Sequence, residues 1–116
     1  MPDQEGDLQV LEAMKAAGSD LSKPAHIIHY LYFKSMSSAE SAATELRSSG
    51  FEKLNVHPSP GDSFWKRLLG KREFSCIAET HAVPSEANVF ESTRQMNDLA
   101  AKHGGEYDGW EASIEH

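Results

Sequence analysis

The sequence has 116 residues, the usual size of one domain, and its 39% hydrophobic and 25% charged residues are typical of a globular protein rather than a disordered chain. A formal net charge of −7 opposes general binding to DNA or RNA, and no apolar run is long enough to span a membrane. The single cysteine excludes an internal disulfide and the acidic first ten residues do not resemble a signal peptide, so we expect one cytoplasmic domain over residues 1–116.

The first predicted element is a helix over about residues 7–17. Leu8, Leu11 and Met14 recur at helical spacing, which predicts that these three side chains form its buried stripe. Gly18 follows as a typical C-terminal stop. Because this helix carries an apolar stripe, we expect it to pack against an edge or a face of the main fold.

A strand and a second helix are predicted next. Residues 26–33 are β-branched and aromatic, with apolar side chains on both faces, which favours a central strand. Ser37 and Glu40 have the spacing of a capping box, and Gly50 is expected to end the helix that follows. The predicted sheet-facing stripe of this helix consists of small side chains and one leucine: Ala39, Ala42, Ala43 and Leu46.

The second half of the sequence repeats the order of strand, helix and strand. Residues 51–57 alternate as a half-buried strand does, and the proline- and glycine-containing residues 58–61 predict a turn. Residues 73–82 predict a strand, residues 84–102 a long helix, and residues 106–114 the last strand.

This element order predicts the fold class. Two strand–helix–strand units joined by a turn make an α+β, ferredoxin-like sandwich of βαββαβ topology. We therefore expect an antiparallel four-stranded sheet in the order 4-1-3-2, with both crossover helices on one face and the N-terminal helix as an addition.

The segment of residues 61–72, GDSFWKRLLGKR, concentrates positive charge in an acidic chain. Its four cations and one acid give +3, so the rest of the chain carries −10. Apolar side chains beside cations are typical of segments that dock on acidic partners, RNA or anionic membranes. A short helical turn whose apolar residues cap the sheet, with its cations in water, has the same composition. The candidate partner-binding residues are Trp65, Lys66, Arg67, Lys71 and Arg72.

The run Tyr107-Asp108-Gly109-Trp110 has two interpretations. Tyr107 and Asp108 are candidates for partner contact, since aromatic residues often anchor interfaces. In the structural interpretation, Trp110 fills core space, Asp108 and Gly109 make a bulge or tight bend, and the Tyr107 hydroxyl finds a hydrogen-bond partner.

No residue pattern is typical of a catalytic or metal site. Cys76 is expected to be a buried core residue on the opposite strand face from His81. His26 and His29 are three apart on one strand, so they point to opposite faces, and His29 and His81 are the pair that strand pairing could bring together. We therefore expect no enzymatic activity, no metal ion and no cofactor.

The residues GGEYDGWE at 104–111 resemble the C-terminal signature of the regulator of ribonuclease activity B family, the protein inhibitors of ribonuclease E. The most specific part is the tetrapeptide Tyr107-Asp108-Gly109-Trp110, which follows a helix that ends near a glycine pair. Further similarity over about residues 7–112 comes from the N-terminal helix, the Gly-Ser-Asp segment 18–20, the histidine-containing strand 26–33 and the helix end at Gly50-Phe51.

The resemblance implies a ferredoxin-like fold with an added N-terminal helix, and a non-enzymatic protein that binds ribonuclease E and changes RNA turnover. The sequence differs from the best-known members by ending at His116 without a long acidic tail and by carrying the basic segment 61–72. Because fold alone does not decide function, a second interpretation stays open, an RNA- or small-ligand-binding module that uses the open sheet face.

Overall fold

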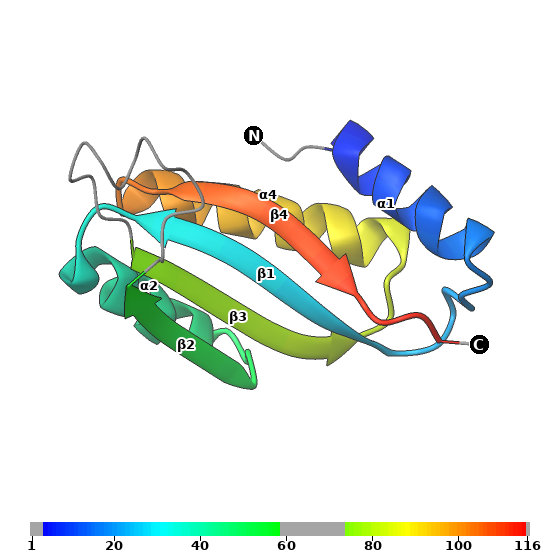
Figure 1. The fold of residues 1–116 in the computed structure, drawn as a ribbon, viewed down its shortest axis with the longest axis horizontal. Coiled ribbons are helices and arrows are strands. Elements are labelled where there is room, and N and C mark those ends of the chain that lie inside the picture. The colour runs from blue at the N-terminus through cyan, green and yellow to red at the C-terminus, as the bar shows by residue number, and fades with distance from the viewer. Residues whose placement is uncertain (1–3, 59–73, 116) are drawn as a thin grey trace.

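The computed structural model describes residues 4–58 and 74–115. Figure 1 shows a sheet with helices packed behind it and at one edge. The elements in chain order are α1 (Gln4–Ala16), β1 (Ala25–Phe33), α2 (Met36–Ser48), β2 (Lys53–Pro58), β3 (Phe74–Ala82), α4 (Glu86–Lys102) and β4 (Glu106–Ala112). None of the helices in these ranges is long and apolar enough to cross a membrane.

The four strands form one antiparallel sheet in the order β2-β3-β1-β4. Counted from the β4 edge, this order is 4-1-3-2, as the sequence predicted. The predicted antiparallel pairing of the first and third strands is confirmed, with Ala25 opposite Ala82 and Phe33 opposite Phe74. The central position of β1 explains why its sequence is apolar on both faces.

Side chains of β1 alternate strictly between a buried and a partly exposed face. The buried face is covered by α2 and α4, which both lie behind the sheet in Figure 1, while α1 packs on α4 beside the β4 edge. The opposite face of the sheet carries His26, Ile28, Tyr30 and Tyr32 of β1, which are all partly exposed. The sheet therefore has one helix-covered face and one face with partly exposed aromatic side chains.

The main core lies between the sheet and the two helices α2 and α4. The four predicted small or apolar residues of α2 are buried, and Leu46 is only 1% exposed. They pack with Cys76 and Ala78, which are both fully buried on β3. Alanine side chains let the helix and sheet approach closely, which is why a stripe of alanines serves as a core here.

Two local predictions were wrong in detail. The N-terminal cap of α2 is Ser35 rather than Ser37, because the Ser35 hydroxyl accepts a hydrogen bond from the Ser38 backbone N–H at 3.1 Å. In α1 the buried residues are Asp7, Leu11 and Met14, whereas Leu8 is 39% exposed. Asp7 is thus buried where the sequence analysis expected Leu8, and this places the Asp7 carboxylate in the wall of the site described below.

Candidate functional site

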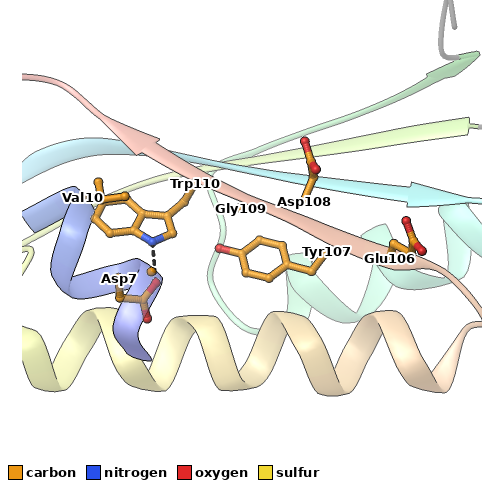
Figure 2. Close-up of a pocket in the computed structure, with 8 residues that line it drawn as sticks. Asp7, Val10, Glu106, Tyr107, Asp108, Gly109 and Trp110 are labelled. Atoms are coloured by element: carbon orange, nitrogen blue, oxygen red, sulfur yellow. Dashed lines mark hydrogen bonds between the residues drawn. The ribbon is translucent and has the colours of Figure 1, made fainter. Parts of the chain in front are cut away.

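A cavity of about 510 Å³ lies between α1 and β4. Figure 2 shows side chains from both elements around it. Its lining is Gly6, Asp7 and Val10 of α1 together with five consecutive residues of β4, Glu106 to Trp110. The Tyr-Asp-Gly-Trp run therefore forms one wall of this α1–β4 cavity, and the first helix forms the other.

The carboxylate of Asp7 joins three elements of the fold. Its Oδ1 accepts a hydrogen bond from the indole Nε1–H of Trp110 on β4 at 2.8 Å, the dashed line in Figure 2. The same oxygen accepts a second bond from the hydroxyl of Thr93 on α4 at 2.9 Å. Asp7 is 1% exposed, and its Oδ2 has no hydrogen-bond partner among the described residues. The cavity wall thus contains a buried carboxylate that is satisfied at one oxygen only.

A second buried polar pair lies next to this carboxylate. Nδ1 of His29 on β1 lies 2.8 Å from the hydroxyl of Tyr107, and both side chains are 2% exposed. Burial lowers the pKa of His29 to about 4, since the charged imidazolium would lose its hydration. Burial likewise raises the pKa of Tyr107. Both groups are therefore neutral at pH 7. The sequence predicted that the Tyr107 hydroxyl has a hydrogen-bond partner, and the structure identifies that partner as His29.

Two glycines shape the β4 wall. The pairing register between β1 and β4 shifts between Tyr30 and Leu31. Gly109 has a φ of +126°, a backbone conformation that glycine adopts more readily than other residues. The predicted bulge at Asp108 and Gly109 is thereby confirmed, and it leaves the Asp108 side chain exposed. A side chain at Gly105 would collide with the backbone oxygen of Tyr32 and the ring of Phe33.

The charge of the cavity is one-sided. Three of its lining residues are acidic, namely Asp7, Glu106 and Asp108, and the described lining contains no lysine, arginine or histidine. Glu106 and Asp108 are exposed, whereas Asp7 is buried, and Figure 2 shows the Asp108 side chain on the other side of β4 from Asp7. Such an arrangement attracts a cation and repels a phosphate group.

The open sheet face above β4 carries an exposed polar pair. The Tyr30 hydroxyl donates a hydrogen bond to Oε1 of Glu111 at 2.7 Å. This bond to a carboxylate stabilises the protonated phenol, and it raises the pKa of Tyr30 to about 12. The pair is part of a face that carries both acidic and aromatic side chains.

The histidine pair on this face differs from the predicted one. His26 stacks on His81 with ring centroids 4.9 Å apart, and each ring also contacts a carboxylate, Glu79 for His26 and Glu52 for His81. The register places His26 opposite His81 and His29 opposite Ala78, so His29 and His81 lie on opposite faces. The predicted proximity of His29 and His81 was therefore wrong.

Other predicted features have different outcomes. Cys76 is fully buried, as predicted, and burial raises the pKa of its thiol to about 11. Within residues 4–58 and 74–115, no group of three or more His, Cys, Asp or Glu side chains is placed to hold a metal ion. The predicted partner-binding residues of segment 61–72 lie outside the described residues: Trp65, Lys66, Arg67, Lys71 and Arg72.

Sequence reasoning identified the β4 wall and missed the side chains that support it. Asp7, Thr93 and His29 were not recognised as members of one buried polar cluster. A usable signal existed for Asp7, because it precedes Leu11 and Met14 by four and seven residues and so shares their helix face. No comparable spacing connects Thr93 or His29 to it.

The similarity to known proteins covers nearly all the residues of the described helices and strands. The family model described as "Regulator of ribonuclease activity B" matches residues 4–112. A relative with that same description, from Idiomarina loihiensis, is 29% identical over 107 residues, which cover 92% of this chain and 79% of the relative. The matched residues include both walls of the α1–β4 cavity and all four strands.

Proposed function

The chain belongs to the regulator of ribonuclease activity B family, and from this premise we propose that it regulates RNA turnover by binding a ribonuclease, specifically ribonuclease E. The observation that carries the proposal is the family match from residue 4 to residue 112, which spans every described element. We also propose that the protein is cytoplasmic, that it requires no cofactor, and that its fold is ferredoxin-like with α1 as an additional helix. The partner is the ribonuclease itself rather than DNA.

A non-catalytic role agrees with the state of the groups most suited to catalysis. The Cys76 thiol is fully buried and its pKa is raised to about 11, so it is protonated at neutral pH. His29 is buried and its pKa is lowered to about 4, far from the value that suits a general base at pH 7. These groups therefore support structure and binding better than chemistry.

Charge supplies a physical route to regulation. Outside the basic segment 61–72 the chain carries −10, while a ribonuclease must present cations to the phosphates of its RNA substrate. An acidic protein docked near such cations would compete with RNA for them. Association of this kind is accelerated by electrostatic attraction and weakened by salt.

A second function, from a different class, is favoured by one observation. Tyr30 and Tyr32 lie on the open face of the central strand, where aromatic rings in sheet-based RNA-binding modules stack on bases. The same face carries Glu79 and Glu111, whose charge opposes a nucleic acid backbone. We therefore rank direct RNA binding below protein binding.

Two measurements on one labelled RNA separate these functions. Cleavage of a fluorescently labelled RNA by purified ribonuclease E should slow as the protein is added in excess, and the protein alone should leave the RNA intact. Fluorescence anisotropy of the same RNA with the protein alone measures direct binding. An unchanged cleavage rate would overturn the proposal, and tight RNA binding without any contact to the ribonuclease would support the second function.

The basic segment has its own matched test. We propose that segment 61–72 contacts an acidic patch of the ribonuclease that is separate from its RNA-binding cations. The double variant Lys66→Glu/Arg67→Glu should therefore associate more slowly and depend less on salt than a control with the same charge change, since the Debye length falls from about 10 Å at 0.1 M to about 3 Å at 1 M. The control Lys34→Glu/Arg47→Glu makes the same charge change at two exposed positions elsewhere. Equal association rates for the two variants would show that segment 61–72 is only a solvated connection.

A further inference from the structure

The carboxylate of Asp7 is only half satisfied. It is 1% exposed, its Oδ1 accepts two hydrogen bonds, and its Oδ2 accepts none from the described residues. A buried charged oxygen without a donor costs more free energy than a neutral one, because the lost hydration is not replaced. A ligand that brings a donor to Oδ2 would recover part of that cost.

The required donor should be positively charged. Asp7, Glu106 and Asp108 line the cavity, and none of its described lining residues is a cation. Two of these carboxylates are exposed, and their charge attracts a cation to this part of the surface. A phosphate or carboxylate ligand would meet only repulsion.

The aromatic part of the wall selects among cations. Trp110 and Tyr107 both line the cavity, and Figure 2 shows the Trp110 ring directly beside Asp7. A guanidinium is planar and weakly hydrated, it stacks on aromatic rings, and its several N–H donors engage carboxylates in a fixed geometry. An ammonium is compact and strongly hydrated, so it gains less from such a wall.

The acceptor is held in place before any ligand arrives. Trp110 and Thr93 fix Oδ1 from two different elements, so the orientation of the carboxylate does not have to be established on binding. The volume of about 510 Å³ is within the range of sites that hold a small group. Because Oδ2 is shielded from solvent, a ligand reaches it only after neighbouring side chains move, as side chains at interfaces commonly do.

We propose that the α1–β4 cavity binds the guanidinium group of an arginine side chain presented by the partner protein, with Asp7 Oδ2 as the buried acceptor and Glu106 and Asp108 as the outer carboxylates. That the arginine belongs to a ribonuclease rests on the proposed function, whereas the preference of the cavity for a guanidinium does not. The Tyr-Asp-Gly-Trp run then has two roles, since it builds the fold and lines the binding site.

The cavity can be tested with a small probe on the intact chain. The indole N–H of Trp110 gives an NMR signal that reports on Asp7, and a Trp65→Phe variant assigns it. Titration with N-acetyl-arginine methylamide should move this signal saturably. The neutral isostere N-acetyl-citrulline methylamide has nearly the same shape without the charge, and it should leave the signal in place. Equal responses to both probes would overturn the proposal.

Substitutions locate the acceptor. Asp7→Asn keeps an oxygen for Trp110 and Thr93 but removes the charge, and it should weaken binding of the arginine probe at least about tenfold. The exposed Glu12→Gln on the same helix lies outside the cavity lining and should bind as the parent does. Asp108→Asn, at an exposed position of the cavity lining, should weaken binding severalfold and serves if Asp7→Asn fails to fold. Unchanged affinity in folded Asp7→Asn or in Asp108→Asn would contradict the assignment.

Ribonuclease assays separate this inference from the proposed function. If the parent protein slows RNA cleavage and Asp7→Asn slows it equally, the cavity proposal fails and the function stands. If the parent binds the arginine probe but leaves the ribonuclease unaffected, the function fails and the cavity stands. We expect inhibition by the parent and a clear loss of inhibition in Asp7→Asn, with the far-UV circular dichroism unchanged.

Discussion

The two ends of the sheet are held by different chemistry. At the β2–β3 end, α2 packs an apolar stripe of alanines and Leu46 against Cys76 and Ala78, and burial alone accounts for the contact. At the β4 end, α1 and α4 add a polar cluster to their apolar contacts. In this cluster Trp110 is partly buried and the other side chains are buried: Asp7, Thr93, Tyr107 and His29. One end resembles an ordinary core, and the other resembles a site.

The difference matters because the two kinds of contact respond differently to change. An apolar core loses free energy roughly in proportion to the volume that a substitution removes. A polar cluster loses more than the bond itself when one partner is removed, since the remaining partner stays buried without a donor or acceptor. The polar end should therefore be sensitive to protonation and to single atoms, and the apolar end should be sensitive to size.

The largest single-residue effect is expected at the apolar end. Leu46 is 1% exposed at the centre of the α2 contact, so Leu46→Ala should lower the free energy of unfolding by about 2–5 kcal/mol. Urea denaturation followed by circular dichroism measures the change, and the dependence on denaturant should stay the same. A loss below about 1 kcal/mol would show that this end is not tightly packed and would remove the contrast between the two ends.

Acid should act mainly on the polar end. His29 has an ordinary pKa of 6.5 and a folded pKa of about 4, so the unfolded chain binds a proton between these values and the folded chain does not. Stability therefore falls as the pH drops from about 6.5 to about 4, by up to about 3 kcal/mol at the low end. Urea denaturation at a series of pH values should show this slope.

A non-titrating variant is the control for this pH dependence. His29→Gln keeps a polar group near the Tyr107 hydroxyl but cannot take up a proton in this range, so its stability should change little between pH 6.5 and 4.5. The carboxyls of Glu45 and Asp20, whose pKa values are lowered by their hydrogen bonds, act only below their ordinary values of 4.5 and 3.8. A parent-like slope in His29→Gln would assign the effect to other groups.

Removing one hydrogen-bond donor from the polar end tests how its members depend on each other. Trp110→Phe replaces the indole by a smaller aromatic ring and removes the N–H that donates to Asp7, so it should cost at least about 1.5–3 kcal/mol, the range for a hydrogen bond to a charged group. In an Asp7→Asn background the same change should cost less, because the acceptor is neutral. Effects that add to within about 0.3 kcal/mol would show that the two side chains are uncoupled.

The sequence predicted the apolar end well because its pattern is local. The alternation of β1, the small-residue stripe of α2 and the order of elements all follow from spacing along one segment. The strand order follows from the connections between them. Even the bulge at Asp108 and Gly109 has a local signal, since glycine interrupts a strand of larger residues.

The polar end could not be predicted in the same way, because its hydrogen-bond partners come from segments that are far apart in the sequence. Hydropathy placed Leu8 inside and left Asp7 unassigned, whereas Asp7 is buried by donors on α4 and β4 that lie 86 and 103 residues away in sequence. The histidine error has a similar origin, since a shift in register decides whether His26 or His29 meets His81. Pairing of this kind is a property of the assembled sheet.

The smallest effect on stability is expected for a polar pair that is exposed rather than buried, on the open face of the sheet between β1 and β4. Tyr30 donates to Glu111, and this bond raises the pKa of Tyr30 to about 12. Glu111→Gln removes the charge, so the pKa of Tyr30, followed by NMR of its ring carbon, should return towards its ordinary value of 10. Because the raised pKa favours the neutral phenol in the folded chain, its contribution to stability is complete below pH 10 and is lost as the pH rises through about 12. Because the pair is exposed to solvent, the substitution should change the free energy of unfolding at pH 7 by less than about 0.5 kcal/mol. A loss as large as that of Trp110→Phe would mean that exposure does not distinguish the two pairs and that the open face is as tightly constrained as the cavity wall.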